Sequence, residues 1–142
     1  MFARIPKSTL YQEAEEEVRQ KWQREWTTSH KAVATGQYFP TVQDRLRSKI
    51  KLTPKITAVL TGHGKTKAYL HRCHLSEKAT CSCDNEYQSM DHLLLHCANT
   101  SAQREVLKQQ IGTSPASKQD LITMHQKEFC AFIGSIDFDD LQ

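Results

Sequence analysis

One stretch decides the fold of this chain, the run from Cys81 to Cys97, CSCDNEYQSMDHLLLHC. Two cysteines are separated by one residue; eight residues, a histidine, four residues and a third cysteine follow. Three thiolates and one imidazole form the ligand set of a tetrahedral structural Zn²⁺ site. The second half has the spacing of a nucleic-acid-binding zinc knuckle, whereas the first half has one residue between its cysteines instead of two and a longer central loop. We therefore expect Zn²⁺ to be bound by Cys81, Cys83, His92 and Cys97.

Some alternatives to this ligand set stay open. His96 could replace His92, and Cys73 could join the site, although Cys73, His74 and Cys130 are more typical of packing or surface residues. The cysteines could also be buried free thiols. Five cysteines, an odd number, and no secretory leader argue against a disulfide scaffold. A site with four protein ligands leaves no position for water, so we expect a structural metal and no enzymatic activity in this chain.

Outside residues 81–97, helical patterns dominate and no alternation typical of strands is found, which predicts an all-α fold of several short helices around one zinc knuckle. The first segment, residues 1–35, should hold a long amphipathic helix that opens at Ser8-Thr9, with Thr9 and Gln12 as a capping box. A basic helical segment follows over 36–80, then the knuckle over 81–97. Residues 98–142 should hold a pair of helices, the last running continuously to Gly134, and a frayed acidic tail.

The first helix carries an aromatic and apolar stripe. Ala14, Val18, Trp22 and Trp26 recur at intervals of four residues, which places them on one side of a helix. Tryptophans in such a stripe could stack on nucleobases. A stripe at helical spacing is more often core, however, and we expect this one to be buried. A short helix holding Val42, Leu46 and Ile50 and another beginning at Thr53-Pro54 should follow it.

Charge is distributed unevenly along the chain. Residues 1–78 contain 15 Lys and Arg against 7 Asp and Glu, and residues 79–142 contain 4 against 9. Between Arg45 and Ser76 eight basic residues occur without an acid, a composition that attracts polyanions. This segment could equally be a solvated helical face. The residues that we expect to contact nucleic acid are Arg45, Arg47, Lys49, Lys51, Lys65, Lys67, Arg72 and Tyr69, with base stacking by Tyr69, Tyr87 or His63.

Several motifs together carry a family resemblance: Trp22–Trp26 (WQREW), Tyr38–Pro40 (YFP), Leu60–Gly64 (LTGHG), Tyr69–Arg72 (YLHR) and the Cys/His run. The chain resembles the C-terminal segment of polyproteins encoded by insect-type non-LTR retrotransposons, the LINE-like, jockey-related elements. In that family the segment lies downstream of the reverse transcriptase and often of an RNase H domain, to whose exit Ile5–Ser8 is similar. Cys73 departs from the pattern, where an aromatic residue is expected.

The resemblance implies an accessory module or truncated copy that binds element RNA or target DNA, since the paired aspartates of a polymerase and the carboxylates of an RNase H site are missing from the sequence. The main alternative is a zinc-pinned docking domain for the rest of the polyprotein, without direct contact to nucleic acid. No apolar run approaches the length of a membrane span, so we expect a nuclear or cytoplasmic protein with no membrane and no small-molecule substrate. The sequence does not distinguish RNA from DNA.

Overall fold

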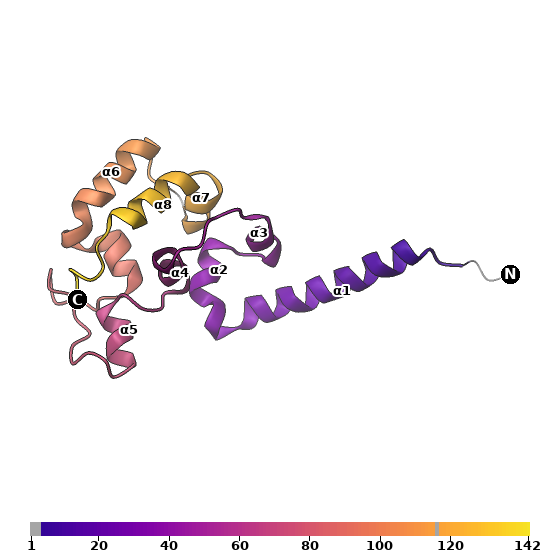
Figure 1. Ribbon diagram of the computed structural model, residues 1–142, viewed down its shortest axis with the longest axis horizontal. Coiled ribbons are helices and arrows are strands. Elements are labelled where there is room, and N and C mark those ends of the chain that lie inside the picture. The colour runs from indigo at the N-terminus through magenta and orange to yellow at the C-terminus, as the bar shows by residue number, and fades with distance from the viewer. Residues whose placement is uncertain (1–3, 116) are drawn as a thin grey trace.

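The computed structural model describes residues 4–115 and 117–142. Its helices are α1 (Lys7–Thr28), α2 (Val33–Tyr38), α3 (Val42–Arg47), α4 (Pro54–Thr61), α5 (Lys67–Arg72), α6 (Ser101–Ile111), α7 (Lys118–Thr123) and α8 (Gln126–Ser135) (Figure 1). A π-helical turn covers His92–His96. No strand occurs among these residues, where one isolated bridge pairs Thr80 with Tyr87. The predicted all-α fold is confirmed.

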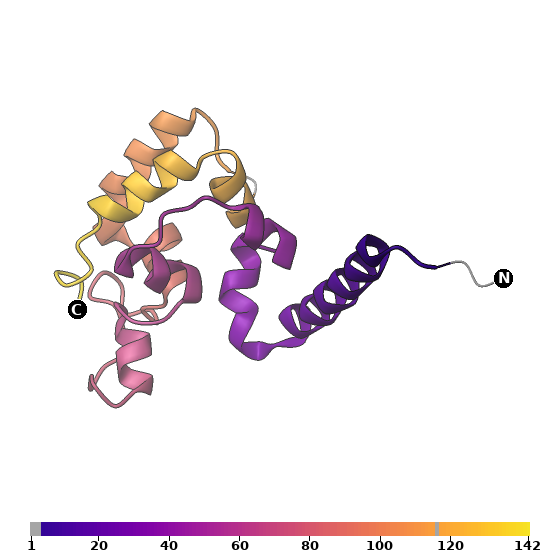
Figure 2. The ribbon, with the colours of Figure 1, turned by 45° about the vertical axis from the view of Figure 1, so that its right-hand side comes forward.

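Helix α1 projects from the rest of the molecule as a long arm (Figures 1 and 2). All of its residues are described, and none of them is buried. Val18 is 65% exposed and Trp22 44% exposed, so the expectation that the apolar stripe belongs to the core was wrong except for the half-buried Trp26. The reason is tertiary: helical periodicity identifies an apolar side of α1, but within the described chain only its C-terminal end meets the body. The start was also misplaced, because the helix begins after Pro6 without a side-chain cap.

The C-terminal end of α1 is held by specific hydrogen bonds to the loop before α3. Trp26 Nε1 donates to Phe39 O at 2.9 Å, and Gln23 Oε1 accepts from Val42 N at 2.8 Å. This loop is itself fixed by a capping box in which Thr41 and Asp44 bond each other's backbone N–H groups. The junction between the arm and the body is therefore an ordered contact.

The middle of the body is built from α2, α3 and α4. As predicted, Thr53 caps α4 and Pro54 occupies its first turn; Gly62 ends the helix at φ +68°, a conformation that favours glycine. Helix α3 is shorter than expected: it stops at Arg47, and its Leu46 is 59% exposed. Ile50 is buried from the extended segment that follows.

Helices α6 and α8 lie side by side and close the core over the metal-ligand segment (Figures 1 and 2). The continuous final helix was a wrong prediction: α7 ends at Thr123 and α8 starts at Gln126, with non-helical backbone at His125. The frayed tail was also wrong, since Ile136 and Phe138 are each 1% exposed and belong to the same core as Phe129. Among the described residues, no helix combines the length and apolar character needed to cross a membrane.

Candidate metal centre and basic surfaces

A tight reversal of the chain brings the first two cysteines of the candidate metal centre into place. Cys81 N donates to Glu86 O at 2.7 Å, and Asn85 N donates to Cys81 O at 3.1 Å. Asn85 adopts a positive φ of 62°, which asparagine tolerates in tight turns. The bridge between Thr80 and Tyr87 closes the base of this loop, so Cys81 and Cys83 project from it toward the π-helical turn.

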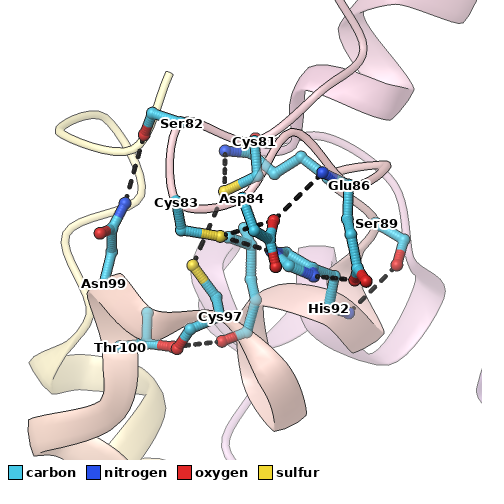
Figure 3. Close-up of polar contacts among 12 residues, drawn as sticks. Cys81, Ser82, Cys83, Asp84, Glu86, Ser89, His92, Cys97, Asn99 and Thr100 are labelled. Atoms are coloured by element: carbon cyan, nitrogen blue, oxygen red, sulfur yellow. Dashed lines mark hydrogen bonds and ion pairs between the residues drawn. The ribbon is translucent and has the colours of Figure 1, made fainter.

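The π-helical turn positions the other two members. Cys97 N donates to His92 O at 2.7 Å, a bond over five residues that is typical of this geometry. It sets His92 and Cys97 on the side that faces the cysteine loop, as Figure 3 shows. Leu93 and Leu94 are buried in the core beneath them. One widened helical turn thus lets this segment bury two leucines and present His92 and Cys97 on its other side.

The side chains of Cys81, Cys83, His92 and Cys97 meet closely enough to hold a metal ion, with all ligand atoms within 4.8 Å of one another (Figure 3). The Sγ atoms of Cys81 and Cys97 are 3.6 Å apart, and Cys83 Sγ lies 3.2 Å from His92 Nε2. A tetrahedral zinc site has edges of about 3.8 Å between sulfurs and about 3.5 Å from sulfur to nitrogen, which follow from its bond lengths. A disulfide requires a sulfur separation of only about 2.05 Å. The spacing thus fits tetrahedral coordination far better than a cross-link.

Carboxylates and an amide surround the four side chains. His92 is buried, and its Nδ1 lies 3.4 Å from Glu86 Oε2. Cys83 Sγ donates to Asp84 Oδ1 at 2.9 Å, which lowers the pKa of the Asp84 carboxyl. Gln88, fully buried, directs Nε2 to Cys81 Sγ at 3.5 Å and to Leu141 O at 2.7 Å. The tail is therefore tied directly to the metal-ligand cluster.

These contacts shift the pKa values of the Cys81 and Cys83 thiols in opposite directions. Burial raises the pKa of the Cys81 thiol, but hydrogen bonds from the Cys83 backbone and the Gln88 amide outweigh it, and the pKa falls below its usual value. For Cys83, burial and the hydrogen bond to Asp84 both raise the pKa. Cys81 is accordingly the thiol that this environment favours as a thiolate.

The alternative ligands lie elsewhere. His96 is exposed at the end of the π-helical turn, and Cys73 and His74 are exposed after α5. Cys130 is half-buried against the hydrophobic core on α8, where burial raises its thiol pKa. Within the described chain these four residues stand outside the ligand group, whereas the exposed Asp84 and Glu86 approach it from the His92 side. Sequence spacing did not reveal these two carboxylates, because their placement depends on the Asn85 turn.

The residues expected to contact nucleic acid do not form one surface. Arg45, Arg47, Lys49 and Lys51 lie on α3 and the segment after it, where Arg47 and Lys49 border an open cavity of about 390 Å³ together with Ser48 and Gln126. Arg45 packs over the Phe39 ring, with Cζ 5.5 Å from its centroid. We call this group the α3 patch.

Arg72 and Tyr69 belong to a second region on α5. Arg72 Cζ lies 5.3 Å from the centroid of the Tyr69 ring, and the exposed His63 ring lies 5.3 Å from it by centroid distance. Beside them is a hollow of about 620 Å³, here called the α5 hollow, lined by His30, Lys31, Val33, Ala34, Gln37, Thr61, Gly62, His63, Arg72, Ser89, Met90 and Asp91. Sequence reasoning missed His30 and Lys31, because they reach the hollow from the corner between α1 and α2.

The remaining predicted residues are Lys65, whose side chain has a partner, and Lys67, whose backbone N–H does. Lys65 Nζ forms an ion pair with Asp139 at 2.9 Å and thereby lowers the pKa of that carboxyl. The backbone N–H of Lys67 donates to Gln88 Oε1 at 2.7 Å. Lys55, from the same basic run, donates to Ile136 O at 2.8 Å. Part of the basic segment thus binds the C-terminal tail.

The known proteins that this chain resembles all come from R1 retrotransposable elements of insects. The chain is 33% identical over 85 residues to the Retrovirus-related Pol polyprotein from type-1 retrotransposable element R1 2 of Nasonia vitripennis, covering 59% of this chain and 21% of that protein. It is 30% identical over 126 residues to the corresponding R1 Pol polyprotein of Popillia japonica, covering 84% of this chain and 49% of that protein. A putative 115 kDa protein in the R1DM element of Drosophila melanogaster is 32% identical over 58% of this chain and 8% of its own length.

The chain thus spans about half of the Popillia protein and a fifth of the Nasonia protein. No family model and no solved structure matches it. The predicted resemblance to insect non-LTR retrotransposon polyproteins is confirmed, and most of this chain corresponds to a segment of R1 polyproteins.

Proposed function

Taking this relation to R1 polyproteins as the premise, we propose that the chain is a zinc-folded accessory module that binds RNA or DNA for a retrotransposon polyprotein. The relatives' names describe polyproteins of retrotransposable elements, whose replication involves nucleic acid. The observation that carries the proposal is the α5 hollow, which Lys31, Arg72 and the His63 ring line together, with the Tyr69 ring beside His63.

Zn²⁺ is the metal that suits the cluster best. Three cysteines and one histidine at tetrahedral separations are a structural zinc set, and Zn²⁺ supplies cross-linking of the loop and the π-helical turn when bound. Cys81 and Cys97 are 1% and 0% exposed and belong to the main core. The residues of this cluster therefore act on folding, and the basic surfaces are left to make contacts.

The acidic character of residues 81–97 supports the same division of roles. This segment carries Asp84, Glu86 and Asp91 and no Lys or Arg, and zinc with three thiolates would retain a net negative charge. Phosphates are attracted to cations, so the cysteine loop is unsuited to contact them. We accordingly assign nucleic-acid contacts to the α5 hollow and, at its own site, to the α3 patch.

The chemistry of the α5 hollow fits one segment of a single strand. Lys31 and Arg72 can bind phosphates, and Asp91, the acid of the hollow, is paired with Lys118. The exposed His63 ring beside Tyr69 offers a face on which a base can stack, a contact worth about 1–3 kcal/mol per base. Because stacking tolerates every base, this site should bind with little sequence preference.

The test is the affinity of zinc-loaded protein for a single-stranded RNA, a single-stranded DNA and a duplex over a salt series. Each neutralised phosphate should add about 0.7 to the log–log slope for single strands and about 0.9 for duplex DNA. We expect Lys31→Glu with Arg72→Glu to weaken single-strand binding and flatten the slope. The control, Lys108→Glu with Lys127→Glu, makes the same charge change in the C-terminal half. Equal effects of both pairs would contradict a site in the α5 hollow.

A second candidate function, protein docking without nucleic-acid contact, is favoured by one observation: the apolar stripe of α1 is exposed. This reading predicts a flat, weak response in the salt series, with the basic patches acting as solvated surface. Retained binding to a protein partner under those conditions would replace the nucleic-acid proposal.

A further inference from the structure

The arm α1 presents an apolar stripe that the described chain leaves open to solvent. Leu10, Tyr11, Val18 and Trp22 are 50%, 71%, 65% and 44% exposed, and Ala14 lies among them on the same side of the helix. The residues that hold the arm to the body, Gln23 and Trp26, lie toward one edge of this stripe. Apolar side chains gathered and exposed on one side of a helix are typical of a site of association.

The low stability of an isolated helix in water also suggests that α1 packs against a partner. α1 has 22 residues and is therefore about 33 Å long, yet no residue of it is buried. Most helical stability in proteins comes from packing of an apolar face, because helix propensity alone is marginal in water. A covered stripe would give α1 the stabilisation that its own contacts lack.

The charges of α1 indicate what covers it, because acids prevail before Val18 and bases after it, apart from Lys7 in the first turn and Glu25 near the end. Before Val18 stand four acids and after it three bases within the next six residues, namely Glu13, Glu15, Glu16 and Glu17 against Arg19, Lys21 and Arg24. A parallel pair of such helices would oppose like charges. An antiparallel pair of identical helices places the acidic half of each beside the basic half of the other, so the pattern is complementary to itself.

We propose that α1 pairs antiparallel with α1 of a second copy of this chain, about a two-fold axis near Val18. Residues equidistant from the axis then lie at the same height, which sets the small Ala14 opposite the large Trp22 of the second copy. Glu15 and Glu17 flank the stripe on opposite sides. By helical geometry they come within one turn of Arg19 and Lys21 of the second copy. A contact of this kind is isologous and closes at two copies.

Sedimentation equilibrium of the zinc-loaded chain tests the proposal, with the expected result a concentration-dependent dimer. Val18→Glu should weaken the dimer by roughly 100-fold, because it places two like charges together on the axis of an apolar interface. Gln20→Glu, the same single-charge change on the opposite side of α1, is the matched control, and it should leave the dimer largely intact. Circular dichroism verifies that each variant keeps its helices.

A charge exchange tests the orientation. Glu15→Lys with Glu17→Lys in one chain and Arg19→Glu with Lys21→Glu in another should each abolish self-association, and mixing the two chains should restore a dimer. A wild-type chain that stays monomeric at every concentration overturns the proposal. So does a dimer that persists in Val18→Glu, or a mixture that fails to associate. Nucleic-acid affinity is measured separately, so these outcomes do not depend on the function proposed above.

Discussion

Glu86 is the residue whose role in the candidate metal centre is easiest to isolate. Its Oε2 lies 3.4 Å from His92 Nδ1, while Nε2 of the same ring faces Cys83. A histidine that binds metal through one nitrogen is commonly oriented by a carboxylate at the other, and losing that partner costs about 10–100-fold in metal affinity. We therefore expect Glu86→Gln to weaken zinc binding toward that range, measured by competition with a chromophoric chelator. Glu77→Gln, the same change at an exposed position outside the loop, should have no effect.

The grouping of Cys81, Cys83, His92 and Cys97 was predictable from spacing, because all four fall within 17 positions. The partners of the basic residues were not, since they depend on distant parts of the chain. Lys65 pairs with Asp139, 74 positions away, and Lys55 bonds the backbone carbonyl of Ile136. A run of like charge in a sequence therefore does not establish a continuous surface. Here the fold separates it into the α3 patch, the α5 hollow and contacts to the tail.

At the scale of elements, sequence signals predicted a helix boundary correctly where neighbouring residues alone determine it. Helix α4 begins at Thr53-Pro54 and ends at Gly62 as predicted, because a capping side chain and a residue with left-handed backbone each act within one helical turn. Periodicity was insufficient for α1 and for the break at His125, since it reports which side of a helix is apolar and not what packs there. The acidic composition of the tail concealed Ile136, Phe138 and Leu141, which pack on or against the core between the acids.

The positions of the tail and the arm predict that shortening a side chain to alanine destabilises the fold in the tail but hardly at all in the arm. Phe138 is 1% exposed in the core, so Phe138→Ala should lower the free energy of unfolding by about 3–5 kcal/mol. Val18→Ala on the exposed stripe of α1 should change it by less than about 0.5 kcal/mol. Both are measured by chemical denaturation of zinc-loaded protein at concentrations too low for self-association. A frayed tail and a buried stripe would reverse this order.

At the scale of the whole molecule, the body and the arm depend on different forces. The body encloses the candidate metal centre in its core, and through Gln88 the centre is linked to the C-terminal tail. The arm shares with the body mainly the junction at Gln23 and Trp26. The unequal charge of the two halves of the sequence thus becomes an acidic cysteine loop, separate basic regions on the body and an arm of mixed charge.

Removal of zinc should therefore unfold the body. Without the metal, the three thiols and the imidazole are polar groups in or beside the core, with no shared ligand to hold the loop against the π-helical turn; the binding free energy of the metal is folding free energy. A chelator should lower the melting temperature and broaden the amide NMR signals of α4, α6 and α8. Acid should act in the same direction, since protons compete with zinc for thiolates and imidazole, and stability is lost as pH falls.

Cys97→Ser should reproduce the metal-free state even with zinc present, whereas Cys73→Ser, at an exposed cysteine outside the cluster, should melt as the wild type does. A body that melts identically with and without zinc would contradict a structural role for the metal.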